Sequence, residues 1–208
     1  MIKRTSQVFA LILSAISAGA LPVRAAQQVL TFDPETSQVG FALSATGEDV
    51  IGLFHLQSGE ITFDTESGEA SGEVVVEAFG AETGSKKRDK AMHNKVLESD
   101  KFPLIVFRPD RVEGEVPSSG SGEIRLLGTM VLHGSEHPMT MPATVEVAGN
   151  YLTATTGFDV PFVEWGLHDP SFFVLKVAKL VNVKITAEGT LTRPEDSAPA
   201  DSAPAQSR

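Results

Sequence analysis

Apolar and polar residues alternate with a period of two along most of the chain. In residues 124–132, Ile124, Leu126 and Met130 fall on one side of the alternation and Arg125 on the other. Similar runs occur at residues 39–43, 60–64, 73–77, 144–147 and 181–186. Successive side chains of a β-strand point to opposite faces, so this spacing predicts strands. Turn residues separate the runs, and about eight strands so spaced favour an antiparallel barrel or sandwich.

One predicted face of these strands carries large, soft apolar side chains. They are Phe41, Phe54, Phe63, Phe107, Met130, Met139, Met141 and Phe158. An eight-stranded barrel has an interior that is either filled by side chains or just wide enough for one small ligand. The pattern predicts an all-β fold and leaves a packed core and an open lumen as alternatives.

Residues 86–98 break the strand pattern and predict one short amphipathic helix. Ser85 is placed to cap its first turn with the side-chain oxygen. Met92 and Val96 lie one turn apart on a narrow apolar stripe. Phe102-Pro103 is expected to end the helix, because the residue before a proline is disfavoured in helical geometry. A helix inserted between strands would close one end of a barrel.

The same segment concentrates positive charge in a chain whose formal net charge is −10. Its cations are Lys86, Lys87, Arg88, Lys90, Lys95 and Lys101. Cations gathered at a barrel rim could hold a phosphate or pyrophosphate head group. Two observations favour the alternative of a solvated face: charge runs are usually exposed, and cations at a helix N-terminus oppose the helix dipole.

The first 25 residues are typical of a signal peptide. Lys3 and Arg4 precede the apolar run 8–20, which is shorter than the ~20 residues that a spanning helix needs. Cleavage is expected after Ala25, with an uncleaved anchor as the alternative. Loss of residues 1–25 removes three basic and no acidic residues, so the charge becomes −13. The mature protein is then expected to be periplasmic or secreted, not integral to the membrane, and a poor partner for nucleic acid or anionic membrane surfaces.

The C-terminal segment 194–208 is of low complexity and repeats Asp-Ser-Ala-Pro-Ala. It lacks large apolar residues, so it is predicted to be a disordered tail. Residues 26–193 then form the single folded domain. The aromatic, turn-rich stretch 165–173 predicts a long loop over an open end of that domain, either as a plug or as a gate for a ligand.

Motifs for catalysis are absent from the sequence. No cysteine is present, which excludes disulfides, thiol catalysis and thiolate metal sites. There is no Gly-x-Ser-x-Gly, Walker or His-Glu-x-x-His motif. His133, Glu136 and His137 could offer zinc ligands, but this spacing is more typical of surface turn residues. We therefore expect a protein that is not an enzyme and holds no metal or cofactor.

Several segments, taken in order, resemble one known family. They are Phe32–Phe41, Gly52–Phe54 with Gly59–Asp64, Arg88-Asp89 with Lys101–Phe107, and Gly128–Gly134 with Pro138–Met141. Together they resemble the YceI-like family, the lipocalin-like polyisoprenoid-binding exported proteins of bacteria. The resemblance covers residues 29–192. Single motifs are weak, but their order and spacing are fairly specific.

The resemblance implies an eight-stranded antiparallel lipocalin-like barrel with one short helix near an open end. Its lumen would hold an isoprenoid-type chain, such as a quinone tail or a polyprenyl phosphate, and the protein would act as carrier or store. The alternatives are a non-enzymatic, stress-related interaction module and a redox helper for a quinone-like substrate. The oligomeric state stays open, with a dimer among the alternatives.

Candidate site residues follow from the apolar pattern and from this resemblance. The predicted lumen residues are Phe41, Phe54, Phe63, Met92, Val96, Leu97, Phe107, Met130 and Phe158, and the predicted head-group rim is Lys87, Arg88 and His93. The chain departs from the family where Ala45-Thr46 replaces a histidine that often follows the first strand. The helix carries Met92-His93 and Val96-Leu97 where the family often has His-Leu and a paired Phe. These departures leave ligand identity and chain length open.

Overall fold

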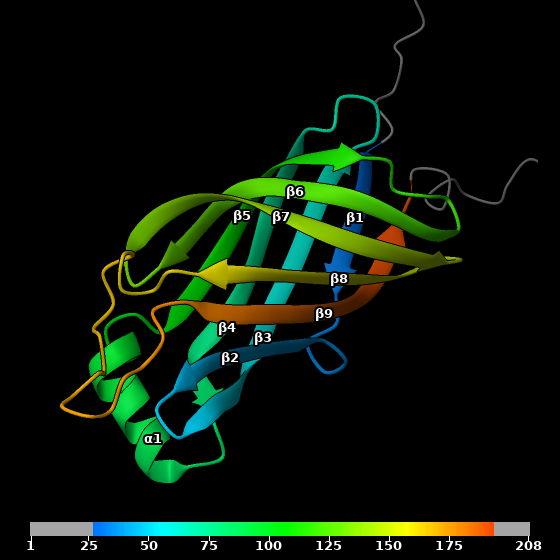
Figure 1. Cartoon of the computed structure of the whole chain (residues 1–208). Coiled ribbons are helices and arrows are strands. Elements are labelled where there is room, and N and C mark those ends of the chain that lie inside the picture. The colour runs from blue at the N-terminus through cyan, green and yellow to red at the C-terminus, as the bar shows by residue number, and fades with distance from the viewer. Residues whose placement is uncertain (1–26, 194–208) are drawn as a thin grey trace, which may run out of the picture.

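The computed structural model describes residues 27–193, which form a closed antiparallel β-barrel (Figure 1). Its strands are β1 (Gln27–Phe32), β2 (Gln38–Ala45), β3 (Glu48–Asp64), β4 (Ala70–Glu82), β5 (Leu104–Gly114), β6 (Gly120–Leu132), β7 (Ser135–Ala148), β8 (Tyr151–Val160) and β9 (Val181–Thr192). The predicted signal peptide and tail lie outside the described residues.

The strands follow one another around the barrel in the order β1-β3-β2-β9-β8-β7-β6-β5-β4, and β3 pairs with β4 to close it. Strands β1 and β2 share one position. Both pair with β3 and β9. Strand β1 pairs with residues 60–64 of β3 and 189–192 of β9, whereas β2 pairs with residues 48–54 of β3 and 182–186 of β9. The barrel therefore has eight positions, which confirms the predicted eight-stranded antiparallel fold.

Irregular pairing bends the long β3–β4 ribbon. Its register shifts between Leu53 and His55 and again between Leu56 and Ser58. Such bulges increase local twist and help a sheet to curl closed. Gly52 lies beside the first shift, where a Cβ atom would stand 2.3 Å from the Phe41 ring and 2.6 Å from the Glu82 carbonyl. Only glycine lets this aromatic ring lie flat against the strand.

The buried residues form two clusters along the barrel axis. The first fills the end away from the helix, where Leu152 is 1% and Leu191 0% exposed. The second lies toward the helix and includes Phe107, Leu132 and Phe162. Full burial of a side chain of this size contributes about 1.5–3 kcal/mol. The first cluster thus stabilises and closes one end of the barrel.

A single helical segment lies between β4 and β5. It begins as α1 (Lys86–Ala91) and continues as the π-helical turn η1 (Met92–Leu97). The predicted cap is wrong: the Ser85 side chain makes no capping bond, and its carbonyl instead accepts the Asp89 N–H at 2.8 Å. The predicted range 86–98 agrees with the structure to within one residue, but Phe102-Pro103 is not what ends the helix: it stops at Glu98, which adopts a left-handed φ of 45°.

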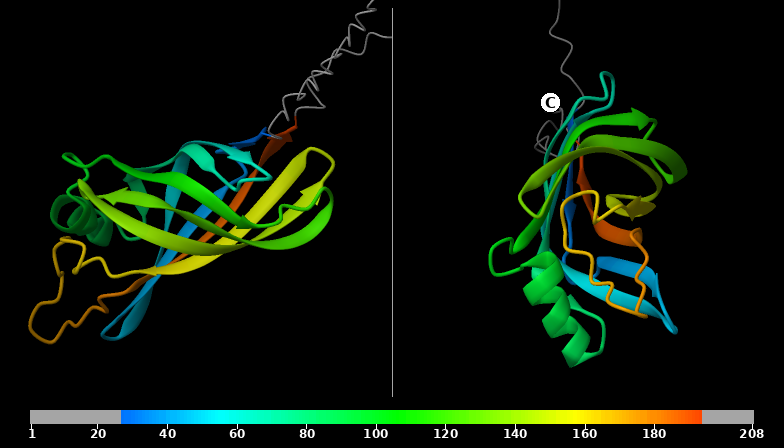
Figure 2. Two further views of the ribbon diagram at one scale, coloured as in Figure 1. Left: turned by 90° about the horizontal axis from the view of Figure 1, so that it is seen from above. Right: turned by 60° about the vertical axis from the view of Figure 1, so that its left-hand side comes forward.

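A long segment, residues 161–180, connects β8 to β9 at the helix end of the barrel (Figure 2). It is tied to the end of β2 by backbone hydrogen bonds. The Thr46 N–H donates to the Lys176 carbonyl at 2.8 Å, and the Ala178 N–H donates to the Ser44 carbonyl at 2.8 Å. Helix and loop therefore flank the same opening. Within residues 27–193, no helix has the length and apolar character needed to cross a membrane.

Candidate functional site

An apolar cavity of about 720 Å³ opens at the helix end of the barrel. Ligand sites for small molecules typically enclose ~300–1,000 Å³ and are lined mainly by apolar side chains. The barrel wall supplies its main surface through inward-facing positions of β2, β3, β6, β8 and β9: Val39, Phe41, Leu43, Val50, Phe54, Met130, Phe158, Val181, Val183 and Ile185. The Phe41 and Phe54 rings lie 5.0 Å apart across β2 and β3.

The helix supplies part of the wall of this cavity. Met92, Val96 and Leu97 line it, and Leu97 is 8% exposed. The helix is held in place by His93, whose Nε2 lies 2.8 Å from the Ala81 carbonyl of β4. Its Nδ1 lies 3.0 Å from the Ser99 hydroxyl. His93 thus fixes the apolar stripe of the helix over the barrel opening.

The polar groups at the mouth are organised around Arg88. Its Nε donates to the Thr83 hydroxyl at 2.9 Å, and one terminal nitrogen donates to Glu48 at 2.7 Å. Asp89 accepts the Thr83 N–H at 2.8 Å. These bonds brace the first helical turn against the end of β4. Lys87 and Lys95 also line the cavity and form no ion pair within the described part of the chain.

A second charged pair lies in the 161–180 loop. Asp169 lines the cavity, forms an ion pair with Lys179, and accepts the Ser171 N–H at 3.0 Å. The hydrogen bond from Lys179, followed by those from Ser171, holds the pKa of Asp169 well below its usual range. Among the described residues of the cavity wall, the carboxylates Glu48 and Asp169 are therefore each paired with a neighbouring cation.

Most of the predicted lumen residues lie on the cavity wall. These are Phe41, Phe54, Met92, Val96, Leu97, Met130 and Phe158. Phe63 and Phe107 do not line the cavity, which corrects their placement. Phe63 is 4% exposed in the cluster at the closed end, and Phe107 is 7% exposed in the second cluster, against Gly128. Both are buried among neighbouring side chains instead of lying on the cavity wall; Phe107 does so although its cross-strand partner Met130 lines the cavity.

The predicted rim is divided in the same way. Lys87 and Arg88 line the cavity, whereas His93 does not, because both of its ring nitrogens are bonded within the protein. The predicted site left out part of the wall, namely Val39, Val50, Phe162, Leu167, Asp169, Val181, Val183 and Ile185, and Lys95 had been counted only among the cations of the helical segment. The alternation at 181–186 was a usable signal for the β9 residues. The loop residues fall within or beside the predicted aromatic loop.

The possible zinc ligands point to different partners. His133 bonds Glu98 at 3.0 Å, and Glu136 lies 3.9 Å from Arg108. His137 stacks on Trp165 with ring centroids 4.0 Å apart, and burial lowers its pKa. Among residues 27–193, no group of three or more His, Asp or Glu side chains is placed to hold a metal ion.

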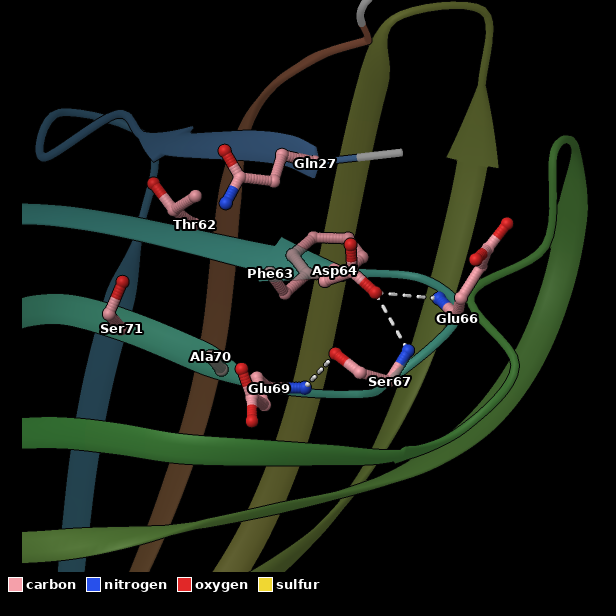
Figure 3. A pocket seen from close by; sticks show the side chains of 9 residues that line it. All are labelled: Gln27, Thr62, Phe63, Asp64, Glu66, Ser67, Glu69, Ala70 and Ser71. Atoms are coloured by element: carbon pink, nitrogen blue, oxygen red, sulfur yellow. Dashed lines mark hydrogen bonds between the residues drawn. The ribbon is translucent and has the colours of Figure 1, made fainter. Parts of the chain in front are cut away.

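A second, polar hollow of about 530 Å³ lies at the closed end beside the β3–β4 turn (Figure 3). One Asp64 oxygen accepts the N–H groups of Glu66 at 3.0 Å and Ser67 at 2.7 Å. These bonds lower the pKa of Asp64, with Ser67 the largest cause. The Ser67 hydroxyl accepts the Glu69 N–H at 3.2 Å. The side chains here close a hairpin turn, so the apolar cavity is the better candidate site.

A closed eight-stranded barrel with a deep apolar cavity at one end, flanked by a short helix, defines a lipocalin-like protein. A model of the YceI-like domain matches residues 30–189, and the chain belongs to this family. The order and spacing of its sequence motifs had indicated the same family.

Relatives and solved structures agree with this assignment. A UPF0312 protein of Vibrio parahaemolyticus is 27% identical over 136 residues, which cover 63% of this chain and 70% of that protein. BcnA of Burkholderia cenocepacia aligns with a TM-score of 0.63 and 15% identity, covering 76% of this chain and 99% of its own. A polyisoprenoid-binding domain from Saccharophagus degradans aligns with a TM-score of 0.62 and 15% identity, covering 78% of this chain and 98% of its own. At this identity the two structures show the shared fold alone.

Proposed function

We propose that this protein binds an isoprenoid-type lipid chain in the cavity and serves as an exported carrier or store for it. The observation that carries the proposal is the apolar cavity of about 720 Å³ at the helix end of the barrel. The Saccharophagus degradans domain of the same fold is described as polyisoprenoid-binding, which supports the same ligand class. Export rests on the signal-peptide pattern of residues 1–25, and we place the protein in the periplasm or outside the cell.

The apolar wall sets the kind of ligand. Each buried methylene contributes about 0.8 kcal/mol, while association and ordering cost ~4–15 kcal/mol. About fifteen chain carbons would contribute ~12 kcal/mol and so offset most of that cost. A short chain would not bind tightly, whereas a quinone tail or a polyprenyl chain of several isoprene units would.

The mouth sets the head-group preference. Arg88 is engaged by Thr83 and Glu48, so it acts mainly as a brace. Lys87 and Lys95 line the same opening without an ion pair in residues 27–193, which leaves them available to a polar or anionic head group. We infer a binding role rather than catalysis, because each carboxylate of the cavity wall is paired with a cation and most of the wall is apolar.

Native mass spectrometry after export and mild purification tests this proposal. We expect a lipid adduct that organic extraction removes and that a polyprenyl phosphate or a long-tailed quinone restores. Val96→Glu places a charge against the bound chain and should weaken rebinding by at least about tenfold. Asn94→Glu, on an exposed helical position outside the cavity, adds the same charge and is the matched control. Absence of an adduct, together with no rebinding of either probe, would refute the proposal.

A further inference from the structure

The tip of the 161–180 loop is an exposed apolar hairpin. Phe172 and Leu175 bond each other in both directions, with N···O distances of 3.0 and 2.9 Å. Phe173 and Val174 occupy the two turn positions between them. Phe172, Phe173 and Val174 are 72%, 81% and 84% exposed. The molecule thus presents three large apolar side chains to solvent at one tight turn.

This turn is an unusual place for apolar residues. Phe173 has a φ of 50°, in the left-handed region that bulky residues rarely adopt. Two-residue hairpin turns favour glycine, asparagine or aspartate, which tolerate that geometry and solvent. Here the sequence accepts both an unfavourable backbone conformation and exposed apolar surface. A strained, exposed position of this kind points to a role for the tip itself.

The tip projects beside the mouth of the cavity and is held there. The backbone of Lys176 bonds both the backbone and the hydroxyl of Thr46, with the Lys176 N–H donating to that hydroxyl at 2.9 Å. Phe172 and Leu175 also line the cavity. In both views of Figure 2 the loop extends at the helix end of the barrel. The apolar tip and the cavity opening therefore face the same side of the molecule.

Charge is distributed unevenly along the barrel. Exposed lysines surround the mouth: Lys86, Lys87, Lys90 and Lys95 on the helix, and Lys176 on the loop. No ion pair within residues 27–193 engages them. Acidic residues gather at the strand ends and turns of the opposite end, including Glu66, Glu69, Glu115, Glu123 and Glu146. Exposed carboxylates also lie at the mouth end, on Glu48, Asp49, Glu82 and Glu164, so the attraction for an anionic surface comes from the lysine-bearing face of the helix and from Lys176 rather than from the whole mouth.

We propose that Phe172, Phe173 and Val174, with the lysines around the mouth, form a docking site for an anionic lipid bilayer. The apolar tip enters the interfacial layer, and the lysines contact lipid phosphates. This orientation turns the cavity mouth toward the leaflet. An apolar chain could then pass between bilayer and cavity with little exposure to water, a consequence that rests on the proposed function. Docking itself does not require an occupied cavity.

Vesicle co-sedimentation tests the docking site with the exported, purified protein. The probes are phosphatidylcholine vesicles with and without phosphatidylglycerol. We expect binding to the anionic vesicles that weakens with salt and is at least tenfold weaker for the neutral ones. Phe173→Ser with Val174→Ser, two positions outside the cavity wall, should reduce binding at least tenfold. Tyr151→Ser, at the first residue of β8 on the opposite end, is the control for exposed apolar area.

A second pair of variants tests the charges. Lys90→Glu with Lys176→Glu should reduce binding to anionic vesicles, whereas Lys184→Glu, exposed on β9, should not. No binding by the unmodified protein, or equal losses in tip and control variants, would overturn the proposal. A tip-dependent dimer without vesicle binding would assign the tip to a second copy instead. Lipid rebinding from detergent reports on the cavity separately, so docking and the proposed function can fail independently.

Discussion

Replacement of His93 by alanine tests whether this ring holds the helix over the barrel. The Ala81 carbonyl can only accept a hydrogen bond, so the Nε2–H of the ring donates to it at 2.8 Å. In the neutral ring, Nδ1 then accepts from the Ser99 hydroxyl at 3.0 Å. The ring joins the helix both to β4 and to the turn that ends the helix. Its removal should loosen both attachments.

The expected loss follows from the burial of these partners. Each lost hydrogen bond removes about 0.5–1.5 kcal/mol net, and a buried group left without a partner costs ~1–3 kcal/mol. Ser99 is 2% and Ala81 3% exposed, so both partners of His93 are buried. His93→Ala should therefore lower the free energy of unfolding by about 2–4 kcal/mol. That is a large share of the ~5–15 kcal/mol typical of a domain.

Urea unfolding monitored by circular dichroism measures this loss, and hydrogen exchange at residues 92–99 locates it. Ser99→Ala and the double variant should give a coupling energy of about 1 kcal/mol. Lys90→Ala, on the exposed face of the helix, should change stability by less than ~0.5 kcal/mol. The reasoning would be refuted if His93→Ala lowered the free energy of unfolding by less than about 0.5 kcal/mol and also altered the head-group preference. His93 would then act as a head-group residue of the rim, as the sequence predicted.

Further expectations concern the two ends of the barrel. Phe63→Ala should lower the free energy of unfolding by ~3–5 kcal/mol without weakening lipid binding, whereas Phe158→Ala should chiefly change lipid binding, as urea unfolding and adduct measurements would show. Lys87→Gln with Lys95→Gln should reduce binding of a polyprenyl phosphate more than that of a quinone with the same tail, measured by competition. Because the pKa of Asp169 is depressed, its ionised form stabilises the folded protein above pH 3.8, and this stabilisation is lost progressively as the pH falls below that value. The urea midpoint of Asp169→Asn should therefore fall less between pH 6 and pH 3 than the midpoint of the unmodified protein. Hydrogen exchange should be faster at residues 170–178 than at residues 92–99.

The strand content and barrel class follow from local sequence because side-chain alternation is a local property. The alternation with a period of two correctly predicted strands at β6, β7 and β9, and the resemblance to the family implied that the sheet closes into a barrel. That β1 and β2 share one barrel position could not be predicted, since it depends on their successive pairing with β3 and β9. The helix range was predicted to within one residue, but its termination was assigned to Phe102-Pro103, because no glycine or proline marks Glu98, which nevertheless adopts a left-handed conformation.

The candidate site was less predictable than the fold. Phe63 of β3 and Phe158 of β8 have the same side chain, and both face the inside of the barrel. One is buried beside Leu152 and Leu191, while the other meets open space. Which level of a barrel is filled depends on side chains contributed by distant strands, and alternation carries no information about them. For the same reason the roles of His93 and Arg88 became visible only with their partners Ala81, Ser99, Thr83 and Glu48.

The two elements at the mouth are held by bonds of different strength. The helix is attached through His93 to the buried Ala81 and Ser99, where lost hydrogen bonds are costly. Beyond the buried Phe162 and Leu167, residues 168–180 of the loop rely on an exposed ion pair, Asp169 with Lys179, and on a few backbone bonds at the end of β2. Exposed ion pairs contribute little, and elements with few buried contacts open first. We therefore expect a lipid chain to enter past the loop, with its apolar tip, while the helix stays in place as the fixed side of the mouth.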